Sequence, residues 1–513
     1  MLKILRVTLA VLSFMAVLLL FVDFTGTAAR LWPWMAKIQL VPALLSFNVA
    51  AIVLLLLVTL LFGRVYCSVI CPLGITQDAV ISLRRRFAPK RRRRAGMFRY
   101  EPAHRKLRAV FLALFLLLVV LGLTGLVATS WAGILEPYSA FGRIASSIFA
   151  PGVRALNNIA SDLSPADSYV FGPVSQASLS GVLLAVAIVS FVVIVVFAWL
   201  TGRGYCNGVC PVGTLLGFLS RYSLLKPVID TSKCNRCGSC GRHCKSQCID
   251  TVNHRIDSTR CVACMDCIGV CRQGAISFSR RPRKAKNLKT SGKTSATDTS
   301  RRSFMLAGAA LAGSAIVSAA DKTVDGGLTP LKRKQAYPDR MPAVPAGAVS
   351  VSHLRRHCTA CQLCIANCPE DILRPSSSLD SLMQPVMLFT DGFCRPECTR
   401  CSDICPAGAF HPLSVEEKSA IKIGRAVVDY SICLSAAGEA ECGSCARNCP
   451  AAAISMVSVD ASDTELPLMP VVDDSACIGC GSCEYHCPVG TVQPIKADRA
   501  AIHIEGLEIH RPI

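Results

Sequence analysis

The sequence predicts an α-helical membrane domain followed by small α+β domains that fold around groups of cysteines. Three observations support this prediction. The mean hydropathy of the 513-residue chain is +0.44, which is too high for a purely soluble protein. Apolar runs at residues 4–22, 41–62, 109–129 and 180–200 approach the roughly 20 residues that a spanning helix needs. The chain also has 29 cysteines, and 24 of them fall into six groups of four.

The charge distribution orients the four predicted spans in the membrane. Residues 1–320 contain 38 Lys and Arg against 11 Asp and Glu, whereas residues 321–513 contain 17 against 23. In the first part the basic residues flank the apolar runs, chiefly at 84–94, 99–108 and 280–293. This pattern follows the positive-inside rule, and its position beside the spans argues against a nucleic-acid-binding patch. We therefore expect the segments after the second and fourth runs in the cytoplasm, and the loops at 23–40 and 130–179 outside.

An internal repeat follows the second and fourth runs within the predicted membrane domain, residues 1–215. GRVYCSVICPLG at residues 63–74 recurs as GRGYCNGVCPVG at residues 202–213. The repeat places Cys67, Cys71, Cys206 and Cys210 at the cytoplasmic ends of two helices. Four thiolates at one depth suit a metal ion or a further iron–sulfur cluster, whereas cysteines at helix ends also serve as redox thiols or packing residues. The sequence leaves these three roles open.

Two cysteine groups with CxxCxxCxxxC spacing define a domain at residues 228–279. This spacing is typical of ferredoxins with two [4Fe–4S] clusters, because three cysteines on a tight loop ligate three irons and the fourth caps the other cluster. A zinc site would leave the triplets unexplained. Lys245 and Arg272 replace the usual proline after the fourth cysteine, and we interpret Cys248 as a small buried residue that is not a ligand. The predicted sets are Cys234, Cys237, Cys240 and Cys271 for one cluster, and Cys261, Cys264, Cys267 and Cys244 for the other.

Four further cysteine groups define a domain at residues 351–513, and each of them ends in Cys-Pro. The second and third groups have irregular spacing, which indicates a four-cluster ferredoxin with insertions. We therefore expect six [4Fe–4S] clusters in the chain, and the modest apolar content between the groups indicates that clusters hold much of this domain together. The predicted ligands are Cys358, Cys361, Cys364, Cys368, Cys394, Cys398, Cys401, Cys405, Cys433, Cys442, Cys445, Cys449, Cys477, Cys480, Cys483 and Cys487.

The segment between the two cysteine-rich domains resembles an export signal. Residues 280–302 form a basic linker that ends in the pair Arg301 and Arg302, and a weakly apolar run rich in Ala and Gly follows at 303–320. A paired arginine before such a run resembles a twin-arginine signal, which carries folded proteins across a membrane. We expect a fifth membrane-crossing helix here, followed by a tether at 321–350. A buried Ala-rich helix in a soluble protein is the alternative.

Both halves of the chain resemble known families. Residues 1–280, with four spans, two GRxYCxxxCPxG motifs and two ferredoxin groups, resemble the NapH family, membrane quinol-dehydrogenase subunits associated with periplasmic nitrate reductase. Residues 300–513, with the paired arginine, the CxxxCxxCxxxCP group and the split group CLSAAGEAECGSCARNCP, resemble the MauM/NapG family of exported polyferredoxins. The chain thus resembles both partners fused. The resemblance implies a multi-pass protein of the bacterial inner membrane, with the two-cluster domain cytoplasmic and the four-cluster domain periplasmic.

The resemblance also implies a function and a pairing of clusters. Electrons would pass from the membrane quinol pool through the [4Fe–4S] clusters to a periplasmic redox protein or reductase, so the chain would be an electron-transfer subunit of a quinol dehydrogenase. Similarity to four-cluster ferredoxins implies a nested arrangement, in which the first group pairs with the fourth and the second with the third. Cys487 would then cap the cluster of Cys358, Cys361 and Cys364.

No substrate-converting site is visible in the sequence, which lacks a GxSxG motif and a phosphate-binding glycine loop in a credible context. Two other functions stay open. One is a maturation or regulatory iron–sulfur membrane protein that serves an exported metalloenzyme. The other is a relay that faces only the cytosol, which would follow if residues 304–320 do not cross the membrane.

Overall fold

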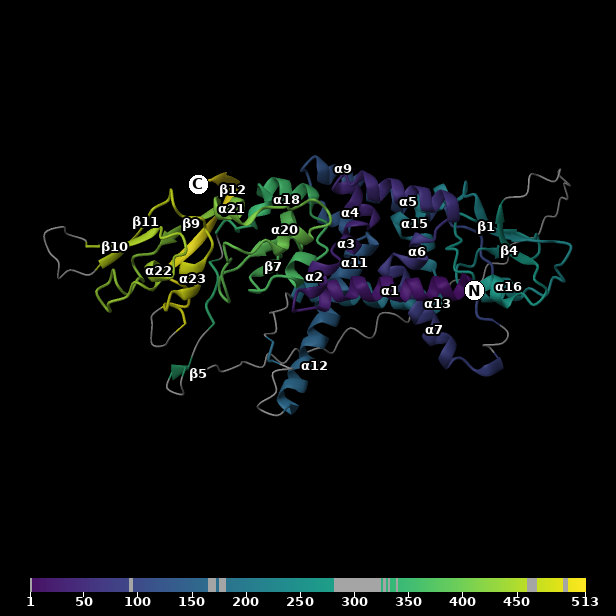
Figure 1. Ribbon diagram of the computed structural model, residues 1–513, viewed down its shortest axis with the longest axis horizontal. Helices are drawn as coiled ribbons and strands as arrows, with labels where there is room; N and C mark the ends of the chain where they lie inside the picture. Colours follow the sequence, from purple (N-terminus) through teal and green to yellow (C-terminus); the bar gives the residue numbers. More distant parts are fainter. Residues whose placement is uncertain are drawn as a thin grey trace.

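The helical part of the chain lies between two cysteine-rich modules in the computed structural model (Figure 1). The structure describes residues 2–91, 96–164, 172–174, 181–280, 324–325, 329–330, 333–337, 340–458, 468–491 and 497–513. The two modules are named after the clusters predicted for them. The two-cluster module, residues 225–280, lies beside the N-terminus at one end of the long axis, and the four-cluster module, from residue 340 onward, forms the other end. Because the long helix α1 (Leu2–Val22) runs along this axis, the modules lie at opposite ends of the helical domain.

The helical domain contains both long and short helices. Besides α1, the longer helices are α5 (Val49–Phe62), α7 (Pro72–Phe87), α9 (Arg105–Leu123), α12 (Ala150–Leu163), α13 (Gly181–Thr201) and α15 (Pro211–Ser220). The shorter ones are α2 (Thr27–Leu31), α3 (Trp34–Lys37), α4 (Leu40–Leu45), α6 (Tyr66–Val69), α10 (Ser130–Gly133), α11 (Pro137–Ile144) and α14 (Gly204–Gly208). A π-helical segment, η1 (Ala145–Phe149), joins α11 to α12.

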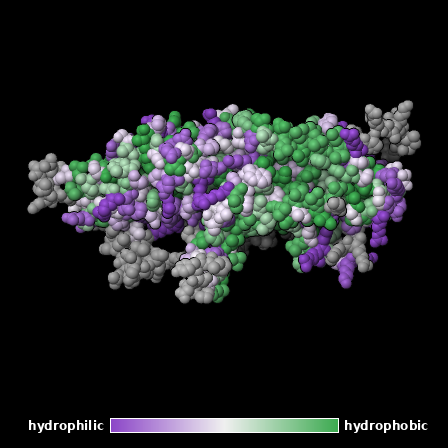
Figure 2. Space-filling model, in the orientation of Figure 1, coloured by the Kyte–Doolittle hydropathy of each residue, from purple (hydrophilic) through white to green (hydrophobic). Residues whose placement is uncertain are grey.

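Three helices of the described chain are long and apolar enough to cross a membrane, namely α1, α9 and α13. Many of their apolar side chains point outward, and hydrophobic surface is concentrated over the helical domain (Figure 2). Such a surface is stable in lipid, where an outward-facing leucine or valine costs nothing. The structure therefore supports a membrane protein.

The predicted second span is not one helix. Residues 41–62 form α4 and α5, which are separated at Ser46, Phe47 and Asn48. Phe47 has a φ of 51°, in the left-handed region that ends a helix, and the side chain of Asn48 accepts a hydrogen bond from Ala51 N as the N-cap of α5. With 14 residues, α5 is shorter than a helix that crosses a bilayer alone. The prediction of four continuous spans is therefore not confirmed.

The two-cluster module has short strands and a core made largely of cysteines. Strand β1 (Leu225–Ile229) pairs antiparallel with β4 (Ile276–Arg280), and β2 (Ile249–Asp250) pairs with β3 (Arg255–Ile256). Helices α16 (Ser239–His243) and α17 (Asp266–Val270) lie between these strands in the sequence. The buried core consists of three cysteines and two isoleucines, so bound clusters would supply much of the stability.

The four-cluster module consists of two units in chain order. The first contains η2 (Ala346–Ala348), α18 (Val351–His357), α19 (Leu363–Ala366), β7 (Leu373–Pro375), η3 (Leu379–Ser381), β8 (Pro385–Met387), α20 (Arg400–Ile404) and α21 (Val415–Ser419). The second contains β9 (Ile421–Val428), α22 (Ser444–Arg447), β10 (Ile454–Ser458), β11 (Leu468–Val472), α23 (Ser482–His486) and β12 (Ile502–Pro512). The antiparallel pairs are β7–β8, β10–β11 and β9–β12, and β5 (Val324–Asp325) pairs with β6 (Thr329–Pro330) before the first unit.

The predicted tether at 321–350 is wrong in its last part. Ala343, Val344, Ala346 and Ala348 are at most 7% exposed and pack in the core of the four-cluster module, because small side chains fit between the cysteine loops. The module therefore begins before residue 351. Arg301 and Arg302, the rest of the linker after residue 280 and the predicted signal helix at 303–320 lie outside the described residues.

Candidate iron–sulfur sites

The two-cluster module brings its cysteines together as their spacing predicts. Each of two cavities is lined by three cysteines from one group and one from the other, which is the arrangement that two [4Fe–4S] cubes need. The cavities are lined by Cys234, Cys237, Cys240 and Cys271, and by Cys261, Cys264, Cys267 and Cys244.

Cys248 lies beside the second set. It is 2% exposed, and its Sγ lies 3.6 Å from Sγ of Cys244. Its burial agrees with the interpretation of Cys248 as a small buried residue. The contact adds a fifth thiol to this cavity, which the spacing of the groups does not indicate.

The first unit of the four-cluster module pairs consecutive groups, so the nested arrangement is wrong. Cys405 lies close enough to Cys358, Cys361 and Cys364 to interact electrostatically with all three. Cys368 likewise interacts with Cys394 and Cys401. The reason is local, because α19 and α20 pack against each other. Cys368, which comes after α19, and Cys405, which comes after α20, therefore each lie near the cysteine loop of the other group. The two sets are Cys358, Cys361, Cys364 and Cys405, and Cys394, Cys398, Cys401 and Cys368.

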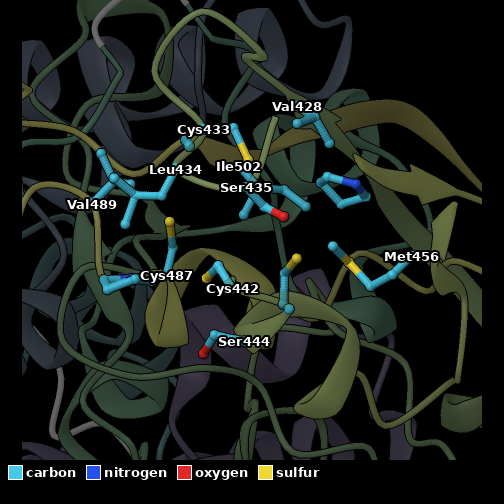
Figure 3. Close-up of a pocket in the computed structure, with 15 residues that line it drawn as sticks. Val428, Cys433, Leu434, Ser435, Cys442, Ser444, Met456, Cys487, Val489 and Ile502 are labelled. Atoms are coloured by element: carbon cyan, nitrogen blue, oxygen red, sulfur yellow. The ribbon is translucent and has the colours of Figure 1, made fainter. Parts of the chain in front are cut away.

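The second unit follows the same rule. One cavity is lined by Cys433, Cys442, Cys445 and Cys487 (Figure 3), while Cys449 interacts with Cys477 and Cys480 of the remaining set, Cys477, Cys480, Cys483 and Cys449. Cys487 therefore lies in the last unit and not on the first cluster. The units meet where Cys394 N donates a hydrogen bond to Cys480 O at 2.9 Å. Neighbouring sets lie close together in the order Cys358, Cys394, Cys477 and Cys433, so the four sets form a row. The second unit, with α22 and α23, lies farther from the helical domain than the first, with α18 and α20 (Figure 1).

The donor sets fit clusters better than single ions. Within the described ranges, no three His, Cys, Asp or Glu side chains are close enough together to hold one metal ion. The ligands of a [4Fe–4S] cube lie farther apart than those of a zinc ion, because each thiolate binds its own iron. Three cysteines of one group and a fourth from another line each of the three cavities, which suits a [4Fe–4S] cluster.

The two copies of the repeat exchange arginine contacts. Arg64 Nη2 donates to the carbonyl oxygen of Cys206 at 3.1 Å, and Arg203 Nη1 donates to the carbonyl oxygen of Cys67 at 2.8 Å. Glycines leave room for the arginine of the other copy, since a Cβ at Gly74 would lie 2.7 Å from Arg203 Nη1 and one at Gly213 would lie 2.8 Å from Arg64 Nη2. These reciprocal hydrogen bonds fix the two copies against each other.

The same arginines lie beside sulfur atoms. Arg64 Nη2 is 3.8 Å from Cys67 Sγ, and Arg203 Nη1 is 3.7 Å from Cys206 Sγ. Gln77 Nε2 approaches Cys206 Sγ at 3.2 Å. Arg64 is fully buried and, among the described residues, its partners are an amide, two carbonyl oxygens and this sulfur, with no carboxylate. A buried guanidinium needs an opposite charge, and thiolates are the anions available.

The second cysteines of the repeat lie at helix N-termini. Cys71 and Cys210 are the N-cap residues of α7 and α15, and Cys210 Sγ accepts a hydrogen bond from Gly213 N at 3.3 Å. A helix N-terminus stabilises a thiolate. All four repeat cysteines are 4–5% exposed and lie near enough to interact with one another. Burial and the neighbouring thiols nevertheless raise the pKa of Cys71 and Cys210, so the arginines and helix N-termini offset only part of the cost of burying several thiolates.

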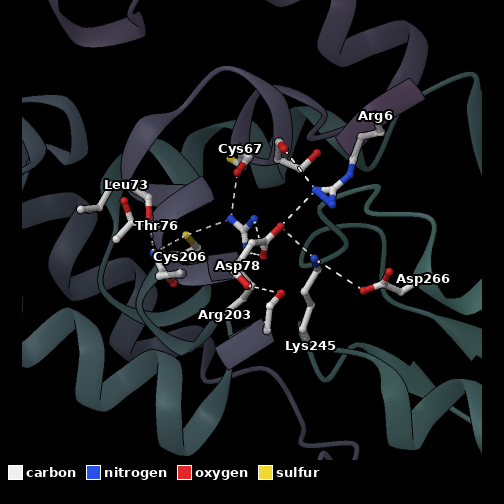
Figure 4. Close-up of polar contacts among 12 residues, drawn as sticks. Arg6, Cys67, Leu73, Thr76, Asp78, Arg203, Cys206, Lys245 and Asp266 are labelled. Carbon is white, nitrogen blue, oxygen red and sulfur yellow. Dashed lines mark hydrogen bonds and ion pairs between the residues drawn. The ribbon is translucent and has the colours of Figure 1, made fainter. Parts of the chain in front are cut away.

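A buried carboxylate connects the repeat to the two-cluster module. Asp78 contacts Arg203 Nη2 at 2.8 Å, Lys245 Nζ at 2.8 Å and Arg6 Nη1 at 3.0 Å (Figure 4). Lys245 also lies 3.5 Å from Asp266. Burial alone would raise the pKa of Asp78, but the three cations outweigh it and hold the pKa below its ordinary value of 3.8. In the sequence, the signal for this network is Lys245, which stands where proline usually follows the fourth cysteine. The spacing of the cysteines alone does not reveal the network.

At its other end the helical domain holds the loop of the Cys358 set through backbone contacts. A Cβ at Gly133 of α10 would lie 2.1 Å from the carbonyl oxygen of Thr359, and one at Gly142 of α11 would lie 2.2 Å from that of Cys361. Asn367 Nδ2 donates to the carbonyl oxygen of Leu20 at 2.8 Å, near the end of α1. This cluster set is therefore fixed against the helices.

Tyr138 of α11 is a residue near this set that sequence reasoning misses. Its side chain is fully buried, and the described residues supply no hydrogen-bond partner for Oη. Cys361 and Cys405 of one set lie close enough to interact with it. An orphaned hydroxyl next to two ligand thiolates fits a bound cluster, whose sulfurs would accept its hydrogen bond.

Tyr138→Phe is expected to lower the midpoint potential of this cluster by about 20–60 mV, which corresponds to one lost hydrogen bond to sulfur. Redox titration followed by electron paramagnetic resonance measures the shift. Tyr430→Phe is the control, because the Tyr430 hydroxyl bonds to Pro470 O in the second unit. Equal potentials in Tyr138→Phe and the unmodified protein would contradict the hydrogen bond.

Two family models match parts of the chain. The model described as a 4Fe-4S binding domain matches residues 46–91 and 183–230, and the only cysteines in these ranges are the four of the repeat. The model described as a 4Fe-4S dicluster domain matches residues 440–491, within the second unit of the four-cluster module. No solved structure matches the chain.

Several curated proteins align with the chain, each over only part of its own length. The chain is 27% identical over 239 residues to the ferredoxin-type protein NapH of Escherichia coli K12, covering 45% of the chain and 67% of the relative. It is 34% identical over 114 residues to the methylamine utilization ferredoxin-type protein MauM of Methylobacillus flagellatus, covering 21% and 47%. It is 33% identical over 117 residues to the uncharacterized protein MJ0749 of Methanocaldococcus jannaschii, covering 23% and 46%. The chain thus spans less than half the length of the last two.

Proposed function

We propose that this chain, which belongs with the ferredoxin-type electron-transfer proteins of membranes, passes electrons from quinol through its clusters to an acceptor outside the cytoplasm. In this proposal it combines a NapH-like membrane half with a MauM- or NapG-like exported half in the bacterial inner membrane. The two-cluster module is cytoplasmic, the four-cluster module is periplasmic, and the acceptor is a periplasmic redox protein or reductase.

The observation that carries the proposal is the placement of the modules at opposite ends of the helical domain (Figure 1). A bilayer around α1, α9 and α13 would separate them, since these helices span it by length and composition. The excess of acidic residues after residue 320 and of basic residues before it agrees with this orientation. The row of cysteine sets then leads electrons outward from the membrane.

We also propose that the four repeat cysteines hold a further iron–sulfur cluster. The family model for 4Fe-4S binding covers these cysteines and no others in its two ranges. Two buried guanidinium groups and two helix N-termini supply positive charge around the site. A cluster with four thiolate ligands carries net negative charge, which this environment offsets.

Iron analysis is expected to give at least about 24 atoms per chain for six cubes, and more if the repeat holds a cluster. Cys67→Ala with Cys206→Ala should lower the iron content by the repeat cluster alone. The control Cys248→Ala removes a buried thiol outside the ligand sets and should leave iron unchanged. About 16 irons in the unmodified protein would show that a module is misassigned, and unchanged iron in the double variant would refute the repeat cluster.

The function is tested by adding a quinol to the anaerobic, oxidised protein in lipid nanodiscs. We expect the visible absorbance of the clusters to bleach and the electron paramagnetic resonance signals of reduced clusters to appear, both at rates comparable with enzymatic turnover. Reduction by dithionite but not by quinol would contradict the proposal and favour the maturation or regulatory alternative.

A further inference from the structure

A cavity of about 240 Å³ lies where the helical domain meets the four-cluster module. Its walls include Asp23 and Arg154 from the helical domain, and Cys368, Asp371 and Arg400 from the module. We infer that this cavity binds the quinol headgroup, an inference that rests on the proposed function. This volume is somewhat below the roughly 300–1,000 Å³ of pockets that bind drug-sized ligands, so the cavity suits a headgroup with a single ring.

The cavity adjoins a cluster ligand at the edge of the predicted membrane layer. Cys368 belongs to the second cysteine set. The side chain of the preceding residue, Asn367, donates a hydrogen bond to the carbonyl oxygen of Leu20 near the end of α1. Asp23 directly follows α1. A headgroup here would contact a thiolate that binds iron while it stayed at the depth where the lipid hydrocarbon ends.

The cavity offers both donors and acceptors for a ring with two oxygens. Arg154 Nη1 and Asp371 Oδ1 lie 3.6 Å apart, and both side chains are less than a fifth exposed. The guanidinium of Arg400 lies over Gly26, where an added Cβ would approach Nη1 to 2.7 Å. Carboxylates accept hydrogen bonds from quinol hydroxyls, and guanidinium groups donate to quinone carbonyls, so reduced and oxidised rings both have partners.

The helix that carries Arg154 connects the cavity with lipid. Four apolar side chains of α12 are 38–82% exposed and recur along one face, at Val153, Leu156, Ile159 and Leu163. The helix projects from the helical domain close to α2 (Figure 1). Such a face is stable against acyl chains, and the isoprenoid tail of a quinol would lie along it.

The reaction at this site balances as follows. One quinol loses two electrons and two protons and leaves as the quinone. The electrons would pass one at a time to the [4Fe–4S] cluster that Cys368 would help to hold. The protons pass from the hydroxyl groups to Asp371 and then to water outside the cavity.

The test uses the holoprotein in nanodiscs with a soluble quinol analogue. Arg400→Gln and Asp371→Asn are each expected to raise the KM for quinol about tenfold, the effect of losing one hydrogen bond to a charged group, and Asp371→Asn is expected to lower kcat as well, because Asp371 accepts the quinol protons. Reduction by dithionite and the resonance spectra should stay unchanged. Arg425→Gln, which breaks the surface pair with Glu505 in the second unit, should leave the KM unchanged. An azidoquinone should label peptides that contain Arg154 or Cys368.

The outcomes separate this inference from the function on which it rests. If the unmodified protein oxidises quinol but both cavity variants keep its KM and the azidoquinone labels other peptides, the site is wrong and the function stands. If the unmodified protein does not oxidise quinol, both fall. If the KM rises and the label maps to the cavity, both are supported.

Discussion

Replacing Cys358 and Cys405 together with alanine is expected to remove the same single cluster that either replacement removes alone. Iron should fall by about four atoms per chain in all three variants, because both thiolates belong to one cube. The basis is the position of Cys405 beside Cys358, Cys361 and Cys364. Iron analysis with Mössbauer spectroscopy counts the remaining cubes.

Cys358→Ala with Cys487→Ala is the matched comparison, since these cysteines belong to different units in the structure. This pair should remove about eight irons. Nested pairing predicts the reverse, with eight irons lost from the Cys358 and Cys405 pair and four from the Cys358 and Cys487 pair. That reversed result would overturn the arrangement described above.

Asp78→Asn is expected to destabilise the helical domain by about 3–5 kcal/mol, because it removes one partner from a buried ion network. Arg203, Lys245 and Arg6 would lose the carboxylate that they share, and Arg203 is fully buried. Unfolding by dodecyl sulfate in mixed micelles, followed by cluster absorbance, measures the change. Asp162→Asn replaces an exposed acid of α12 and should change stability by less than about 0.5 kcal/mol.

The contribution of Asp78 also has a defined pH dependence. Because its pKa is lowered in the folded protein, its stabilising effect is fully present above the ordinary carboxyl pKa of 3.8 and is lost as the pH falls through the lower folded value. Between pH 7 and pH 5 the difference between Asp78→Asn and the unmodified protein should therefore stay constant. A difference that shrinks over this range would show that the carboxylate is not held by the three cations.

Cysteine spacing predicted the local part of each cluster site and not always the partner. Three cysteines on one loop are fixed by sequence, and in the two-cluster module the fourth could be assigned too, because only one other group is near. In the four-cluster module the fourth ligand depends on how α19 and α20 pack, which spacing does not contain. This is why the resemblance to four-cluster ferredoxins assigns Cys487 wrongly to the cluster that Cys405 completes.

Hydropathy predicted the helical domain but not its interruptions or its buried charges. The run at 41–62 is apolar enough for a span, yet Asn48 caps a new helix inside it, and this single polar residue was the available signal. Arg64 and Asp78 look like surface charges in the sequence, since their burial depends on contacts with residues more than a hundred positions away. Arg301 and Arg302 lie outside the described residues, so the export signal stays a prediction.

Sealed membrane vesicles of known orientation test the central claim most directly. A quinol is supplied in the bilayer and the impermeant oxidant ferricyanide is added outside, with vesicles of the Cys394→Ala variant, which removes a ligand of the cluster beside the cavity, as the background. The account predicts that ferricyanide is reduced rapidly by right-side-out vesicles, whose outer face carries the four-cluster module, and only at background rate by inverted vesicles. Rapid reduction by inverted vesicles, with right-side-out vesicles at background, would contradict electron delivery from quinol to the outside.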